Sequence, residues 1–290
     1  MFINPISYPG NKNKLLSQIM ALVPNNTETF VDIFCGSGVV GLNSDASTVV
    51  ANDISQEALA VLKFFYDNSF KQIVTKIEKI IKKYGLTYTR KHPKGFYVEY
   101  KHEGLSRYNK GGYDRLKQDY NKDKSVDKLL VLLIYGFNHY IRFNKDGVFN
   151  VPVGKVDFSD SIYNAMEKFV NHIKTKDVIF SNKDFRDIDL YRDDKAIYYF
   201  DPPYLVTTAP YNQNWQEKDE KDLLQLLDNL DGRGIKFMLS NVLLSNGKEN
   251  TILKKWARKY IVCPMRRQYR NANYQKVNVT DTVEVLIKNF

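Results

Sequence analysis

The chain has 290 residues, enough for one large domain or two modest ones, and its 43% hydrophobic content supports a buried core, which excludes wholesale disorder. The 43 lysines and arginines outweigh 33 aspartates and glutamates, and the net charge of +10 favours a polyanionic partner, nucleic acid ahead of an anionic membrane surface. On charge alone, a basic protein without such a partner explains the surplus equally well.

Cysteine and histidine usage narrows the class further. Cys35 and Cys263 stand far apart and outside any CxxC pair, which excludes a disulfide framework and favours a reducing compartment. The four histidines show neither HxxxH nor Cys/His ligand spacing, so we expect no metal site. Residues 1–16 lack the apolar run of a signal peptide, and no apolar stretch approaches the roughly 20 residues of a membrane span. We therefore expect a cytoplasmic protein that does not enter a membrane.

Strand and helix patterns alternate along most of the chain. Strand-like runs lie at 29–34, 47–53, 177–181, 196–201, 235–241, 260–265 and 282–289, and helical patterns lie at 55–67, 217–230 and 247–259. Several of the strand-like runs are continuously apolar, which is typical of strands covered on both faces. The alternation predicts an α/β fold with a mainly parallel sheet.

Residues 69–175 interrupt this alternation. Residues 71–85 predict an amphipathic helix that ends at Gly85, with its apolar face formed by Ile73, Val74, Ile77, Ile80, Ile81 and Tyr84. Further helices are expected around 113–121 and 125–141, and Lys145-Asp146-Gly147 predicts a hairpin turn between short strands. We interpret 69–175 as a mostly helical insertion that carries a β-hairpin.

A glycine-rich turn follows the first strand. Gly36-Ser37-Gly38 connects a strand to a helix, where glycines let a ligand approach the backbone and the helix N-terminus. With Gly41 the spacing also fits the dinucleotide fingerprint, so a nicotinamide enzyme is an alternative. Asp53 ends the next strand, where a carboxylate can bind both hydroxyls of a ribose, although a helix N-cap is the simpler explanation.

The strand at 196–200 is followed by Asp201-Pro202-Pro203-Tyr204. A turn with an incidental acid is one explanation. The other is a receptor for a planar amine, in which the Asp201 carboxylate and the Pro202 carbonyl accept the two amino protons and Tyr204 stacks on the ring. Such acceptors would localise the lone pair of a conjugated amine and make it nucleophilic.

Several motifs, taken in this order, resemble one enzyme family. The motifs are YPGNK (8–12), FVDIFCGSG (30–38), ANDIS (51–55), IRFNKDGVFNVPVGK (141–155), KDF (183–185) and DPPY (201–204). Together they resemble the Dam-like adenine-N6 DNA methyltransferases over nearly the whole chain. The resemblance implies a Rossmann-like methyltransferase sheet with an antiparallel C-terminal strand. It divides the chain into a catalytic domain at 1–68 and 176–290 and a target-recognition domain at 69–175.

The resemblance also implies roles for individual residues. S-adenosylmethionine would be the cofactor, bound by Tyr8, Lys12, Asp32, Gly36, Gly38, Asp53, Asp184, Phe185 and Asp201. The catalytic group would be Asp201, Pro202 and Tyr204, and the target adenine would be flipped out of the duplex to reach them. DNA contacts are implied for Tyr140, Arg142, Asn144, Asn150 and Pro152, although for Asn144 and Asn150 hydrogen bonds to the hairpin backbone are the favoured interpretation. An arginine in that hairpin suits bidentate contact with a guanine.

The chain departs from the family pattern at three places. Asp32-Ile33 stands where Glu-Pro is usual, Tyr8-Pro9-Gly10-Asn11-Lys12 replaces Trp-x-Gly-Gly-Lys, and His139 stands where a small residue is usual. The first two keep the chemical type, whereas the third leaves the target sequence open.

The resemblance predicts methylation of adenine N6 in double-stranded DNA. A restriction endonuclease would be a functional partner, unless the enzyme acts alone in regulation or comes from a phage. Methylation of cytosine N4, of RNA or of a glutamine amide remains open, as do a nicotinamide oxidoreductase and a DNA-binding module with an inactive core.

Overall fold

The computed structural model describes residues 2, 4–6, 10, 12–93, 95–97, 104–190, 192–207, 215–266 and 282–290. The chain forms two compact units. The first consists of residues 1–11, 36–39 and 55–176, and the second of residues 12–35, 40–54 and 177–290.

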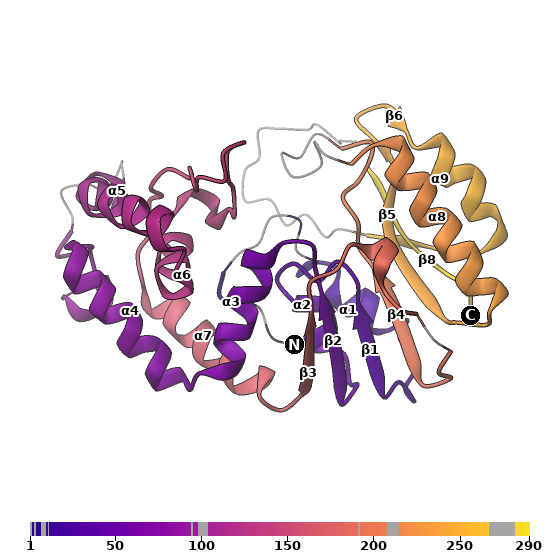
Figure 1. Cartoon of the computed structure of the whole chain (residues 1–290), viewed down its shortest axis with the longest axis horizontal. Helices are drawn as coiled ribbons and strands as arrows, with labels where there is room; N and C mark the ends of the chain where they lie inside the picture. Colours follow the sequence, from indigo (N-terminus) through magenta and orange to yellow (C-terminus); the bar gives the residue numbers. More distant parts are fainter. Residues whose placement is uncertain are drawn as a thin grey trace. The chain divides into compact units, whose positions relative to one another are not determined.

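The second unit is built on one twisted sheet (Figure 1). Its strands are β1 (Thr29–Asp32), β2 (Thr48–Asn52), β3 (Asp177–Ser181), β4 (Ala196–Phe200), β5 (Phe237–Ser245), β6 (Lys248–Glu249), β7 (Ile261–Met265) and β8 (Val283–Lys288). The order across the sheet is β3-β2-β1-β4-β5-β8-β7, with β6 paired to the end of β5. From β3 to β5 all neighbours are parallel, whereas β8 runs antiparallel to both β5 and β7. The predicted mainly parallel α/β sheet with an antiparallel C-terminal strand is confirmed.

Two helices cover the β4–β5–β8 part of this sheet. Helices α8 (Glu217–Gly232) and α9 (Thr251–Trp256) lie side by side in Figure 1, and their leucines pack with apolar side chains from those strands. All five residues of β4 are buried, as expected of a strand inside a parallel sheet. Shorter helical segments of this unit are α1 (Leu16–Met20), η4 (Phe185–Asp187) and η6 (Ala257–Lys259), and α2 (Val39–Asn43) follows β1.

The expected helix at 247–259 starts later than predicted. Asn246 and Gly247 adopt positive φ angles of 49° and 77°, which make a tight turn and pair β6 back onto β5. The helix α9 begins only at Thr251, where the Asn250 side chain accepts a hydrogen bond from the Leu253 amide at 3.0 Å. Turn chemistry at Asn246-Gly247 therefore overrides the helical apolar spacing.

The first unit is helical. It contains α3 (Gln56–Asp67), α4 (Phe70–Tyr84), η1 (Thr89–Lys91), α5 (Ser106–Asp123), α6 (Val126–Tyr135), η3 (Phe137–His139) and α7 (Asp160–Ile173). Helix α6 packs against α3, α4 and α5, and every residue from Leu129 to Tyr135 is buried, which explains its lack of a polar face. The amphipathic helix at 71–85 is confirmed, since α4 buries the predicted isoleucines and ends at Gly85 with φ 64°.

The helix expected over 125–141 ends at Tyr135. Gly136 has no room for a side chain, because a Cβ there would lie 2.5 Å from the Leu132 carbonyl oxygen. Asn138 and His139 then adopt left-handed φ angles of 53° and 56°, which asparagine and histidine tolerate better than most residues. At position 139, where the family pattern has a small residue, this chain has a histidine, which can still adopt the left-handed conformation.

Two adjacent glycines of α5 provide a test of this packing. A Cβ on Gly112 would lie 2.2 Å from the Tyr84 carbonyl oxygen, whereas one on Gly111 would have its nearest neighbour, an Arg115 nitrogen, at 3.7 Å. We expect Gly111→Ala to stabilise the protein by about 1 kcal/mol through helix propensity, and Gly112→Ala to destabilise it by about 2 kcal/mol or more through overpacking. Urea unfolding of the two variants measures both, and effects of the same sign would contradict the packing of α4 against α5.

Candidate active site

Four neighbouring parallel strands bring an aspartate to the same edge of the sheet. Asp32 ends β1, Asp53 directly follows β2, Asp184 lies shortly after β3, and Asp201 directly follows β4. The carboxyl ends of strands in an open α/β sheet are the usual ligand-binding edge. The structure thus brings the four predicted acids of the second unit to one edge of the sheet.

Asp32 is a buried carboxyl with an unused oxygen. Its Oδ2 accepts a hydrogen bond from the Gly41 amide at 3.1 Å, and its Oδ1 has no hydrogen-bond partner among the described residues. Burial raises the pKa of Asp32 to about 8 against the lowering effect of the Gly41 N–H, and the charges of Asp201 and Asp53 add to the rise. A positively charged ligand would favour the ionised form of this buried carboxyl, because it would offset the cost of burying the charge.

The glycines of the first turn have distinct roles. Gly36 and Gly38 adopt positive φ angles of 47° and 70°, so both positions favour glycine. Gly41 lies where α2 packs on β1, and a Cβ there would lie 3.0 Å from Val49 and 3.2 Å from the Asp32 Cβ. The third glycine is therefore explained by helix–strand packing.

Asp53 is not a helix cap. The N-cap of α3 is Ser55, whose side chain accepts from the Ala58 amide at 3.2 Å. Instead, the segment around Asp53 is joined to the segment after β3. The Asn52 side chain bonds both the N–H and the carbonyl of Lys183, and the Asn182 amide donates to the carbonyl of Asp53 at 2.8 Å. The simpler explanation that the sequence left open for Asp53 is thereby removed.

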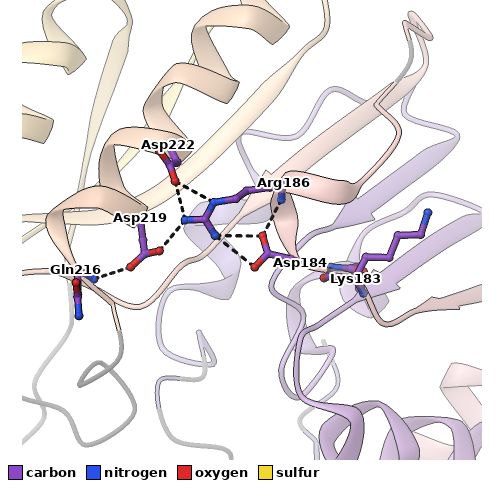
Figure 2. A network of polar contacts seen from close by, with 7 residues as sticks. Lys183, Asp184, Arg186, Gln216, Asp219 and Asp222 are labelled. Atoms are coloured by element: carbon purple, nitrogen blue, oxygen red, sulfur yellow. Dashed lines mark hydrogen bonds and ion pairs between the residues drawn. The ribbon is translucent and has the colours of Figure 1, made fainter.

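Asp184 is held by an arginine that sequence reasoning missed. Figure 2 shows Arg186 between Asp184 and two aspartates from the first turns of α8, Asp219 and Asp222. The Asp184 carboxylate accepts from the backbone and the side chain of Arg186, which makes it the cap of η4. This network fixes the loop after β3 to the start of α8.

Phe185 is largely part of the core. It is 5% exposed, its ring lies 5.6 Å from Phe34 and 5.7 Å from Trp215 between ring centroids, and the Arg186 guanidinium lies over it at 4.3 Å. The Trp215 ring nitrogen in turn donates to the buried Glu220 carboxylate at 2.8 Å. Aromatic packing under this edge is thus anchored to α8.

Asp201 lies in a buried ionic cluster. Its Oδ2 is 2.7 Å from the Lys12 ammonium, and its Oδ1 accepts from the Tyr204 hydroxyl at 2.9 Å. That hydroxyl also lies 3.3 Å from Glu284, and Lys12 lies 4.0 Å from the same Glu284 oxygen. Burial raises the pKa of Asp201, against the lowering effect of Lys12, and burial together with the two acids raises the pKa of Tyr204 well above its ordinary value.

The sequence did not predict some residues of this site, and one predicted site residue lies outside the described residues. Tyr8 lies outside the described residues. Glu284 went unnoticed because it begins an antiparallel strand, whose N-terminal end lies at the edge where parallel strands finish. In the first unit, the Asn4 amide donates to the Ser37 carbonyl at 2.8 Å and so fastens the glycine turn. No sequence signal marks Asn4, whereas Arg186 follows the predicted Asp184-Phe185 pair directly.

The residues with implied DNA contacts lie together in the first unit. Phe143 and Phe149 form an antiparallel bridge, so the predicted hairpin is present, although its strands are single bridges. Arg142 donates from Nε to the Asn150 side chain at 2.8 Å and from a terminal nitrogen to the Asn150 carbonyl at 3.1 Å. These two bonds fix the plane of the guanidinium.

The neighbouring polar residues mainly support the hairpin. The Asn144 side chain accepts from the amides of Asp146 and Val148 and so forms the turn. The Pro152 carbonyl accepts from the Phe137 amide at 2.9 Å. The Tyr140 hydroxyl lies 3.5 Å from the Asn138 amide nitrogen. These hydrogen bonds therefore hold the backbone of the hairpin that carries Arg142.

Comparison with known families identifies the family of the chain. Residues 8–271 match the model of the D12 class N6 adenine-specific DNA methyltransferases, and the chain belongs to this family.

Among individual relatives, the type II methyltransferase M.FokI of Planomicrobium okeanokoites is 33% identical over 296 residues, which cover 99% of this chain and 43% of that protein. The modification methylase StsI of Streptococcus sanguinis is 32% identical over 298 residues, with the same coverage of 99% and 43%. The DNA adenine methylase of Escherichia coli strain K12 is 24% identical over 246 residues, 81% of this chain and 79% of that protein. The chain thus spans less than half the length of the first two relatives.

No group of three or more histidine, cysteine, aspartate or glutamate side chains in the described ranges could hold a metal ion. Within the same ranges, no helix has both the length and the apolar character needed to span a bilayer.

The raised pKa of Asp32 predicts a pH-dependent stability. Between about pH 4 and pH 8 the native protein would keep a proton that the unfolded chain has released, so stability falls as pH rises through this window. Asp32→Asn keeps an acceptor for Gly41 and removes this loss. We expect the variant to gain a few kcal/mol over the wild type between about pH 5 and pH 8. Urea unfolding without cofactor measures the gain, and a difference independent of pH would show that Asp32 is ionised throughout.

Proposed function

We propose that the protein transfers a methyl group from S-adenosylmethionine to the N6 amino group of adenine in double-stranded DNA. Membership of the N6 adenine-specific family supports this activity. The observation that carries it is Asp201, the acid of the Asp-Pro-Pro-Tyr motif, which lies at the carboxyl edge of the sheet and is held by Lys12 and Tyr204.

The residues present fit the proposed cofactor. S-adenosylmethionine carries an ammonium group and a sulfonium, and their positive charge would favour the ionised form of Asp32, whose buried Oδ1 has no partner among the described residues. Glycine at 36 and 38 permits close approach to the backbone, and Asp53 stands where a ribose-binding acid is needed. We assign cofactor binding to Tyr8, Lys12, Asp32, Gly36, Gly38, Asp53, Asp184, Phe185 and Asp201. When bound, the cofactor would supply an activated methyl group.

The chain's own residues would prepare the acceptor. Asp201 and the Pro202 carbonyl would each accept one amino proton of adenine, which localises the nitrogen lone pair toward the incoming methyl group, and Tyr204 would stack on the base. Because a base inside the duplex cannot reach these groups, the reaction requires the adenine to leave the helix. Positioning is the main contribution of the protein, so neither a metal nor a covalent nucleophile is needed.

Target recognition is assigned to residues 69–175. The two hydrogen bonds to Asn150 fix the guanidinium of Arg142, which suits bidentate recognition of a guanine in the major groove. Tyr140, Asn144, Asn150 and Pro152 would support or extend this contact. The net charge of +10 suits a phosphate backbone.

The cellular role is inferred from the relatives. The names type II methyltransferase and modification methylase support a role in restriction–modification, with a restriction endonuclease as the functional partner. A DNA substrate supports a cytoplasmic location, which we infer for this protein.

Expression in a host without DNA methylation tests the activity. Single-molecule sequencing of the host DNA should show N6-methyladenine at one short sequence, whereas N4-methylcytosine would redirect the proposal to cytosine. Asp201→Ala should abolish the modification and keep part of the cofactor affinity, measured by calorimetry, because the other cofactor-binding residues remain. Full methylation by that variant would exclude the proposed role of Asp201.

Arg142→Ala tests base reading. We expect it to relax the preference at one base pair of the target, at a cost of roughly 1–3 kcal/mol. Methylation rates on duplexes that vary each target position measure this. Lys145→Ala removes a charge from the same hairpin and should lower the rate equally on all sequences. An unchanged preference in the Arg142 variant would remove this residue from base readout.

A further inference from the structure

Glu284 is a buried acid close to the reaction centre to which the sequence motifs assign no role. It is 3% exposed and is the second residue of β8, where it pairs with Val242 of β5 and Met265 of β7. Because β8 is antiparallel to β5, this end of the strand lies at the edge where β4 and β5 finish. Strand direction thus brings a carboxylate from the C-terminal part of the chain to the Asp-Pro-Pro-Tyr motif.

Two hydrogen-bond donors are shared between Glu284 and Asp201. The Tyr204 hydroxyl lies 2.9 Å from Asp201 Oδ1 and 3.3 Å from Glu284 Oε1. The Lys12 ammonium lies 2.7 Å from Asp201 Oδ2 and 4.0 Å from the same Glu284 oxygen. Each oxygen of Asp201 is thus bound by one donor. For both donors, Asp201 is the nearer of the two carboxylates and Glu284 is the farther one.

This sharing bears on how Asp201 could bind an amino group. An amine that donates to Asp201 competes with Tyr204 and Lys12 for its lone pairs. A displaced donor without another acceptor would be expensive, because buried polar groups and charges cost several kcal/mol when they lose their partners. Glu284 offers a second acceptor within a short movement of both donors.

We propose that Glu284 is a positioning residue that receives the Tyr204 hydroxyl and the Lys12 ammonium when Asp201 takes up the amino group of the target base. The inference rests on the proposed methyltransferase function and deepens it. The hydroxyl moves from one carboxylate to the other, the ammonium follows, and no bond other than hydrogen bonds and ion pairs changes. Glu284 does not touch the base.

The cluster also sets the charge at the reaction centre. Among the described residues of the second unit, the charged or titratable groups around Asp201 are Lys12 from the segment before α1, Asp32 from the end of β1, Tyr199 from β4, the nearby Tyr204, and Glu284 from β8. Among these, Glu284 acts as a like charge that opposes ionisation of Asp201. Neutralising Glu284 should therefore shift the ionisation of Asp201 to lower pH.

Glu284→Gln keeps the size of the side chain and removes its charge. We expect the single-turnover rate of methyl transfer on duplex DNA to fall about tenfold or more, the scale of one hydrogen bond to a charged group. The acid limb of the pH–rate profile should move to lower pH, because a like charge beside Asp201 has been removed. Glu284→Asp, which keeps the charge, should restore the limb to its wild-type position.

A second variant separates positioning from folding. Tyr204→Phe keeps the ring and removes the hydroxyl that engages Asp201. In that background, the loss of methyl-transfer rate caused by Glu284→Gln should be at least threefold smaller than in the wild type, about half of the effect on a logarithmic scale. A loss caused only by weakened folding would be additive. Glu220→Gln is the matched control, because Glu220 is also fully buried but accepts from Trp215, Asn241 and Asn250. It should leave the acid limb in place.

The proposal requires both the shift of the acid limb and the reduced effect in the Tyr204→Phe background. An unmoved limb or additive losses would overturn it. If the wild-type protein methylates no DNA, the proposed function fails first, and the two failures are thereby distinguished.

Discussion

The clustering of like charges at the carboxyl edge of the sheet is the constraint on which the rest of the site depends. Parallel strands that end side by side deliver their terminal acids to one place, and burial there disfavours ionisation. Different acids are accommodated in different ways. Asp32 is driven toward its protonated form, Asp184 is paired with Arg186, and Asp201 is paired with Lys12 and Tyr204. The result is an edge that is neutralised internally and still rich in acceptors.

The antiparallel direction of β8 allows the start of a strand to contribute a side chain to the edge where the parallel strands end. In a purely parallel sheet, every side chain at this edge comes from a strand end or the loop after it. A strand of opposite direction places its first residues there instead, so Glu284 lies on a strand that is paired on both sides, with β5 and with β7. A carboxylate on a central strand is more rigidly placed than one on a loop, which suits a group that others move toward.

The sequence allowed the sheet, the amphipathic helix at 71–85 and the acids at the strand ends to be predicted, because apolar periodicity and strand-terminal motifs are local signals. Partner choice was not predictable. The pairing of Asp201 with Lys12 spans most of the chain, and nothing in the Asp-Pro-Pro-Tyr motif indicates that its tyrosine would turn its hydroxyl toward its own acid. The helix expected at 247–259 was misjudged at its start because the Asn246-Gly247 turn competes with apolar spacing over the same residues. Boundaries set by backbone conformation were therefore less predictable than the elements themselves.

The engagement of both Asp201 oxygens favours one kind of ligand over others. A group that offers a single donor could bind either the Asp201 carboxylate or the neighbouring Pro202 carbonyl, but not both. An exocyclic amino group carries two N–H donors in one plane, and the Pro202 carbonyl stands next to Asp201 in the chain as an acceptor for the second. A ligand that binds Asp201 replaces hydrogen bonds that already exist, so the net gain in binding free energy is small. Discrimination between ligands then depends on how completely each ligand satisfies the acceptors. An acid already occupied by its neighbours is thus a more selective receptor for an amine than a vacant carboxylate would be.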